Sequence, residues 1–174
     1  MKKLIYIFVF FISVSISGQN SLKKLLKKYN TESVSYASVE NLKKLLKRPF
    51  DSAQGDNNIV IIDARELKEY NVSHIENAIH VGYDHFNLKE TTAKLTNKKA
   101  AIIVYCSIGI RSEDIAEKLQ NAGYKNVYNL FGGIFEWKNK ENIVVDSKNQ
   151  PTENVHTFNK EWSTWLKKGI KVYE

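Results

Sequence analysis

Short apolar runs alternate with amphipathic segments through most of this chain. Consecutive apolar residues are typical of strands that are buried on both faces of a sheet. We expect such strands at residues 59–62 and 101–105, which are apolar throughout, and at 34–38, 78–81 and 127–130, which are mostly apolar. Apolar residues at helical spacing predict helices at residues 20–29, 39–46, 66–70, 88–95 and 112–122. The last helix ends before Gly123, and glycine is common just beyond a helix C-terminus.

The alternation of strands and helices predicts the fold class. Strands that are apolar on both sides need helices over both faces of their sheet. We therefore predict an α/β fold with a small central parallel β-sheet flanked by helices on both faces. In such sheets ligands bind beyond the carboxyl ends of the strands. Asp63 and Cys106 directly follow two of the predicted strands.

The alternation ends before residues 139–174. The features of this part are a short extended piece at 143–146, a polar turn at 149–154, and Trp162, Trp165 and Leu166 at helical spacing. We interpret residues 139–174 as a C-terminal arm that packs on the domain. Its tryptophans are expected to serve in packing rather than in contacts with a ligand.

The N-terminus has the pattern of a secretory signal peptide. Lys2 and Lys3 precede an apolar stretch over residues 4–16, and small residues lead up to Gly18. The apolar stretch is shorter than the roughly 20 residues that span a bilayer. We therefore expect removal of residues 1–18, which predicts an exported protein, periplasmic or secreted, with no stable membrane span.

The rest of the 174-residue chain is long enough for one domain with a hydrophobic core. Residues 19–32 are expected to form an N-terminal helical extension. Because two lysines leave with the leader, the formal net charge falls from +7 to +5. Many of the remaining lysines lie at 22–28 and 42–48, opposite leucines, as on solvated helix faces. This distribution, together with export, argues against a nucleic-acid partner.

Cys106 is the only cysteine of the chain, and it lies between a predicted strand and a predicted helix. Backbone N–H groups and the helix dipole at such a position favour an anion, and therefore a thiolate. Gly109 gives the loop backbone angles that other residues disfavour, and Arg111 adds a permanent positive charge. The loop thus outlines a small anion cradle with Cys106 as the candidate nucleophile. The alternative is a small buried hydrophobe at a strand end, but Gly109 and Arg111 in the same loop favour the functional interpretation.

An ordered set of short motifs runs through the middle of the chain. They are Ile61-Ile62-Asp63-Ala64-Arg65-Glu66, Tyr70, His74-Ile75 with Ala78, Cys106-Ser107-Ile108-Gly109-Ile110-Arg111-Ser112, and Gly132-Gly133 with Trp137. In this order they resemble the single-domain sulfurtransferases of the rhodanese family. The resemblance covers residues 33–138, which we interpret as a rhodanese-like domain.

The resemblance implies a reaction at Cys106. The thiolate would accept a sulfane sulfur from thiosulfate or a persulfide donor, carry it as a persulfide, and pass it to a thiol, cyanide or protein acceptor. The residues that the resemblance assigns are Cys106 and Arg111 as catalytic residues, Ser107, Ile108, Gly109, Ile110 and Ser112 as the substrate-binding loop, and Asp63, Arg65 and His74 as supporting residues. The resemblance implies no metal and no organic cofactor.

Some roles within this set stay open. Arg111 either contacts the charged oxygens of the donor or braces the loop. Asp63 is expected to hold Arg111 or Arg65 through charge-assisted hydrogen bonds. His74 resembles a scaffold residue of the family.

The loop departs from the family pattern at its rim. Ser107 stands where many family members carry a basic residue, and Ile108 and Ile110 make the rim apolar. Both features lower the affinity that we expect for thiosulfate.

Two other functions are compatible with parts of this pattern. Phosphatases also cradle an oxyanion between a cysteine and an arginine, but the four residues between Cys106 and Arg111 form a tighter ring than a tyrosine-phosphatase loop. A tighter ring suits one sulfur atom better than a phosphate. The second alternative is a partner-dependent sulfur carrier or a non-catalytic binding module on the same fold. Turnover with cyanide would distinguish a sulfurtransferase from a sulfur carrier and from a binding module.

Overall fold

The computed structural model describes residues 21–47 and 59–173. The chain divides into two compact units, residues 1–32 and 33–174. In the first unit, residues 21–29 are helical, as expected for the N-terminal extension. The expected leader at 1–18 lies outside the described residues, so export stays a prediction from the sequence. No helix in the described ranges is long and apolar enough to cross a bilayer.

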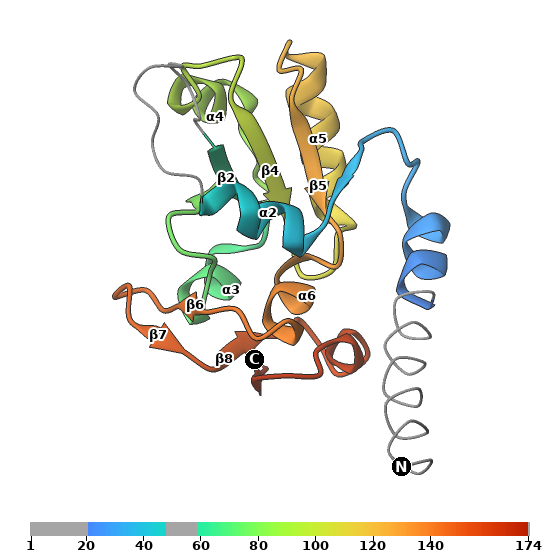
Figure 1. Ribbon diagram of the computed structural model, residues 1–174, viewed down its shortest axis with the longest axis vertical. Helices are drawn as coiled ribbons and strands as arrows, with labels where there is room; N and C mark the ends of the chain where they lie inside the picture. Colours follow the sequence, from blue (N-terminus) through green and yellow to red (C-terminus); the bar gives the residue numbers. More distant parts are fainter. Residues whose placement is uncertain (1–20, 48–58, 174) are drawn as a thin grey trace, which may run out of the picture. The chain divides into compact units, whose positions relative to one another are not determined.

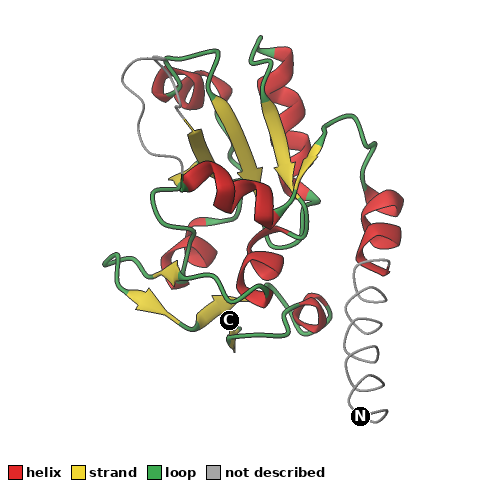
Figure 2. Ribbon diagram, viewed as in Figure 1, coloured by secondary structure: helices red, strands yellow, loops and turns green. Residues whose placement is uncertain are grey.

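The second unit is built on a five-stranded parallel sheet (Figures 1 and 2). Its spatial order is β1 (Tyr36–Ala37), β5 (Val127–Leu130), β4 (Ala101–Tyr105), β2 (Ile59–Asp63) and β3 (Ile79–His80). Every neighbouring pair is parallel. The register aligns Asp63 with Tyr105 at the carboxyl ends of β2 and β4, directly before Cys106. The predicted α/β class with a central parallel sheet is therefore confirmed.

Helices cover both faces of this sheet. In the described part of this unit, the α-helices are α2 (Val39–Leu46), α3 (Leu67–Val72), α4 (Leu88–Lys94), α5 (Arg111–Asn121) and α6 (Gly133–Asn139). In Figure 1, α2 lies in front of the sheet and α4 and α5 lie behind it. The fully buried side chains of Ile62, Val104 and Ile115 pack together in the core between the sheet and α5. This packing fixes the start of α5 next to the end of β4.

One helix was not expected from the sequence. Helix α6 begins after Gly132, whose φ is 74°, and Gly133 continues with a φ of 53°. The two glycines indicate a turn, and the six helical residues after them are too few for a clear helical period. The short helix is held by burial of Phe135 and Trp137 rather than by local propensity.

Residues 139–173, which belong to the segment interpreted from the sequence as a C-terminal arm, contain more strand than the sequence predicts. The elements are β6 (Val144–Val145), β7 (Pro151–Thr152), β8 (Asn154–His156), the 3-10 helix η1 (Trp162–Trp165) and β9 (Ile170–Val172). The expected polar turn at 149–154 is wrong in part, because β7 pairs with β6 and β8 pairs with β9. The β6–β7 ladder is a hairpin around the turn, whereas the β8–β9 ladder joins segments on either side of η1, which local composition does not encode.

The arm lies across the carboxyl ends of the central strands, beside α3 and α6 (Figure 1). His74 and Val145 exchange two backbone hydrogen bonds of 2.8 and 2.9 Å, which attach the arm to the segment after α3. The arm is therefore placed at the edge of the sheet where ligands bind in this class of fold.

Candidate active site

The segment from Cys106 to Ile110 turns between β4 and α5 and surrounds the thiol. The Cys106 side chain is buried, and the Gly109 N–H donates a hydrogen bond to its Sγ at 3.1 Å. Gly109 has a φ of 111°, a conformation that favours glycine. The Ser112 Oγ lies 3.5 Å from the same sulfur. The Gly109 N–H is a donor that suits a sulfur atom carrying negative charge.

A buried asparagine holds the loop from the side of the sheet. Asn129, in the middle of β5, donates from Nδ2 to the Gly109 carbonyl at 2.8 Å. Its Oδ1 accepts a hydrogen bond of 2.7 Å from Ser112 Oγ. Asn129 is fully buried, and its position within an apolar strand was the signal that sequence reasoning missed.

Helix α6 holds the loop from the opposite end. The N–H groups of Ile134 and Phe135 donate to the carbonyls of Cys106 and Ser107 at 2.9 and 3.1 Å. Gly133 makes this approach possible, since a Cβ at this position would lie 2.2 Å from the Cys106 carbonyl oxygen. The carbonyls of Cys106 and Ser107 are thus bonded to α6, while the Gly109 N–H faces the sulfur.

Arg111 is held by a buried glutamate of α3. Its Nη1 and Nη2 donate to the two carboxylate oxygens of Glu69 at 2.7 and 2.8 Å, and Nη2 also donates to Ser107 Oγ at 3.1 Å. Burial would raise the Glu69 pKa, but the hydrogen bonds and charge of Arg111 outweigh it and lower this pKa to about 2. Of the two roles expected for Arg111, the geometry supports bracing. Glu69 was not singled out from the sequence, because nothing local indicates that it is buried.

Replacing Glu69 with glutamine should remove one source of acid sensitivity. The folded pKa of about 2 lies below the ordinary value of 4.5, so the carboxylate stabilises the protein above pH 4.5. This contribution is lost as the pH falls toward 2. Between pH 7 and pH 3 the wild type should lose about 2 kcal/mol more of its unfolding free energy than Glu69→Gln does. Urea unfolding at both pH values measures the difference.

A matched control is available in the arm. Glu141 forms an ion pair of 3.3 Å with Lys168, and the two side chains are 74% and 58% exposed. Glu141→Gln should change stability by less than about 1 kcal/mol at pH 7, whereas Glu69→Gln should cost about 3 kcal/mol. Equal costs, or equal pH dependence of wild type and Glu69→Gln, would contradict the bracing role.

Asp63 and Arg65 form a separate buried cluster. Arg65 donates from Nε and Nη2 to the Asp63 carboxylate, and from Nη2 to the Ser73 carbonyl at 2.6 Å. The Tyr105 hydroxyl donates to Asp63 Oδ2 at 2.7 Å and accepts from the Ile75 N–H at 3.1 Å. Asp63 therefore holds Arg65 and not Arg111. The cluster supports the strand ends beneath the loop.

His74 lies away from the loop cavity. Its ring stacks on Tyr70 with 3.8 Å between ring centroids, and its backbone pairs with Val145. This arrangement agrees with the scaffold role expected for it. Within the described residues, no group of three or more His, Cys, Asp and Glu side chains could hold a metal ion.

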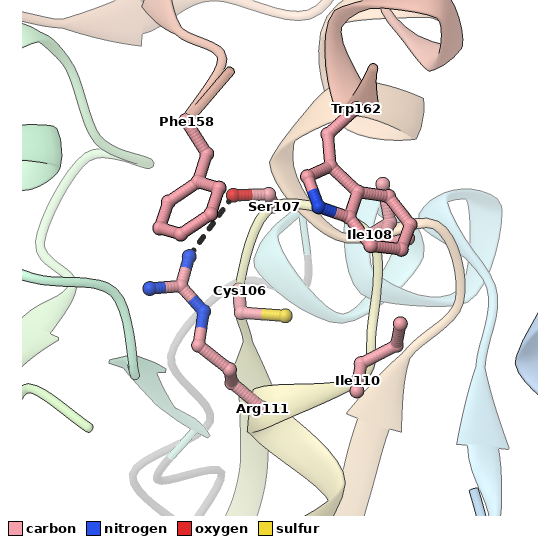
Figure 3. Close-up of a pocket in the computed structure, with 7 residues that line it drawn as sticks. All are labelled: Cys106, Ser107, Ile108, Ile110, Arg111, Phe158 and Trp162. Atoms are coloured by element: carbon pink, nitrogen blue, oxygen red, sulfur yellow. Dashed lines mark hydrogen bonds between the residues drawn. The ribbon is translucent and has the colours of Figure 1, made fainter. Parts of the chain in front are cut away.

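A cavity of about 200 Å³ opens at the thiol. Figure 3 shows its lining, which consists of Cys106, Ser107, Ile108, Ile110, Arg111, Phe158 and Trp162. The sulfur of Cys106 points into the space between Arg111 and Ile110, and Phe158 and Trp162 lie across from it. Trp162, which the sequence assigned to packing, lines this cavity with its ring. Phe158 was not singled out from the sequence, because its place at the site depends on the path of the arm.

Comparisons with known proteins agree with this geometry. The family model described as Rhodanese-like domain matches residues 42–140. The thiosulfate sulfurtransferase GlpE of Coxiella burnetii (strain RSA 331 / Henzerling II) is 40% identical over 80 residues, which cover 46% of this chain and 72% of that protein. The tRNA uridine(34) hydroxylase of Photorhabdus laumondii is 35% identical over 108 residues, but these cover only 28% of that protein and 60% of this chain.

Two solved structures share the fold. The BH2092 protein of Bacillus halodurans superposes with a TM-score of 0.54 and 24% identity, over 72% of this chain and 86% of that one. A thiosulfate sulfurtransferase of Pseudomonas aeruginosa gives a TM-score of 0.56 and 20% identity, over 86% of this chain and 26% of that one. At these identities the likeness concerns the fold alone.

Proposed function

This chain belongs to the rhodanese-like domain family, and from that premise we propose that it is a sulfurtransferase in which Cys106 carries the sulfur. The observation that supports this best is the environment of the thiol. Its Sγ accepts the Gly109 N–H at 3.1 Å and borders a cavity large enough for a donor. A thiolate in this position has both a stabilising donor and room for an incoming sulfur atom.

The proposed reaction has two steps. In the first, the Cys106 thiolate attacks the sulfane sulfur of the donor, the donor's sulfur–sulfur bond breaks, and its electron pair leaves with sulfite or with a thiolate. Cys106 then carries a persulfide anion. In the second, the acceptor attacks the outer sulfur and regenerates the thiolate, with thiocyanate as the product when the acceptor is cyanide. Neither step needs a proton from the protein.

The residues around the loop act by positioning in this proposal. Glu69 and Arg111 tie the loop to α3, Asn129 fixes the Gly109 carbonyl, and α6 binds the carbonyl of Cys106. The loop amide is therefore in place before the persulfide forms, which is the preorganisation that electrostatic stabilisation requires.

Phosphate chemistry is less well supported. A phosphatase loop uses its arginine as a bidentate donor to the phosphate oxygens. Here both terminal nitrogens of Arg111 are bonded to Glu69.

The similarity to the tRNA uridine(34) hydroxylase does not support a tRNA substrate for this chain, because the match covers less than a third of that protein's length.

Steady-state kinetics test the proposed function. With thiosulfate as donor and cyanide as acceptor, initial rates of thiocyanate formation should show a double-displacement pattern, with parallel lines in double-reciprocal plots. The physical reason is that the donor's leaving group departs before the acceptor reacts. Converging lines would mean that both substrates must bind together and would contradict a persulfide intermediate. Sulfur uptake without turnover would identify a carrier instead of an enzyme.

A further inference from the structure

The charge of the cavity does not match an inorganic donor. Among the lining residues, within the described part of the chain, Arg111 alone carries a charge. Its guanidinium is bonded to Glu69, so the pair has no net charge to offer a dianion such as thiosulfate. Ser107, next to the nucleophile, adds a hydroxyl that is bonded to Glu69 and Arg111. The cavity therefore lacks the cationic groups that would replace the hydration of a small dianion.

The size and the lining of the cavity match an apolar group. Four of its lining side chains are Ile108, Ile110, Phe158 and Trp162. An apolar cavity of roughly 150 Å³ takes up benzene in another protein, and this one measures about 200 Å³. A transferred sulfur atom alone would leave most of this volume unfilled, so there is room for a group of the size of an aromatic ring.

The arm holds its aromatic residues in place over the loop. Phe158 has a φ of 65°, a left-handed backbone conformation that is rare and strained for a bulky residue. Its N–H donates to His156 Nδ1 at 3.1 Å, and its ring lies 5.5 Å from the Arg111 guanidinium carbon. The backbone N–H of Trp162 donates to Asn159 Oδ1 at 2.9 Å. A strained backbone that places a half-exposed ring over a reactive loop points to a function of that ring.

We infer that the preferred sulfur donor is an organic thiosulfonate or persulfide with an aromatic or branched apolar group, and that Phe158 and Trp162 determine this preference. The inference rests on the proposed function. For an aryl thiosulfonate, the Cys106 thiolate takes the terminal sulfur, the sulfur–sulfur bond breaks, and the electron pair leaves with an aryl sulfinate. The apolar group occupies the space between the isoleucines of the loop and the aromatic residues of the arm.

The test compares three probes with cyanide as acceptor: benzenethiosulfonate, methanethiosulfonate and thiosulfate. We expect the wild type to have a kcat/KM for the aryl donor at least about tenfold above that for the methyl donor. Trp162→Ala and, separately, Phe158→Ala should lower this aryl-to-methyl ratio by about tenfold. Because each variant is compared with the wild type on the same two donors, differences in intrinsic reactivity cancel.

Trp165→Ala is the matched control, since Trp165 lies in the same 3-10 helix and does not line the cavity. Its ratio should equal that of the wild type. Thermal melting of all variants separates a lost contact from a lost fold, and Phe158→Ala keeps the test valid if Trp162→Ala fails to fold.

The outcomes separate this inference from the proposed function. Suppose that all three donors transfer sulfur and that neither Trp162→Ala nor Phe158→Ala changes the aryl-to-methyl ratio of kcat/KM. This result would overturn the inference and leave the proposed sulfur transfer intact. The same holds for a wild type that uses thiosulfate better than the aryl donor. Failure of every donor to place sulfur on Cys106 would overturn the proposed function, and the inference with it.

Discussion

Cys106→Ser should reduce sulfur transfer by at least about three orders of magnitude, because a serine hydroxyl is not ionised at neutral pH and does not form a persulfide. The fold should remain. The thiol contributes one N–H donor contact and is replaced by a group of nearly the same shape, so the unfolding free energy should change by less than about 1 kcal/mol. Thiocyanate formation and urea unfolding, measured on the same preparation, test the two parts.

The stability measurement is the control for this experiment. A variant that is inactive and folded supports Cys106 as the nucleophile. A variant that keeps its activity would overturn the mechanism, since Cys106 is the only cysteine in the sequence.

Gly133→Ala should be the most damaging change outside the thiol. An added Cβ would lie 2.2 Å from the Cys106 carbonyl oxygen and 2.8 Å from the carbonyl of Ser107, and both are backbone atoms that cannot move aside independently. The residue also has a φ of 53°. We expect a loss of about 3 kcal/mol or more in unfolding free energy, with a matching loss of sulfur transfer because the loop must shift.

Gly82→Ala separates the two causes of this loss. Gly82 has a φ of 71°, but the nearest atom to its added Cβ is a side-chain carbon of His80 at 3.9 Å. Only the backbone cost of about 1 kcal/mol should remain. If urea unfolding gave similar losses of unfolding free energy for the two variants, the close contact between α6 and the loop would not contribute to stability.

The parts of the fold that could be predicted are those with a local signal. The apolar runs at β2, β4 and β5 are long enough to stand out, and the amphipathic pattern of α2 is strong. Because parallel strands end at one edge of a sheet, the position of Cys106 beyond β4 followed from the same pattern.

The parts that could not be predicted depend on distant contacts. The local sequence predicts Glu69 as an exposed residue of a short polar helix. It is buried only because α3 packs beside the loop and Arg111 bonds to it. Asn129 is polar within an apolar strand, but its partners Gly109 and Ser112 are distant in sequence. The role of the arm is hidden for the same reason, since Phe158 reaches the cavity only through the path of β8.

The most direct measurement is the intact mass of the purified protein before and after incubation with excess donor, and again after cyanide. Thiosulfate and benzenethiosulfonate are used in separate incubations. We expect a gain of one sulfur atom, its removal by cyanide, and no gain in Cys106→Ser. A protein that gains no sulfur from either donor, while its Cys106 is free to be alkylated, would contradict persulfide chemistry at this site.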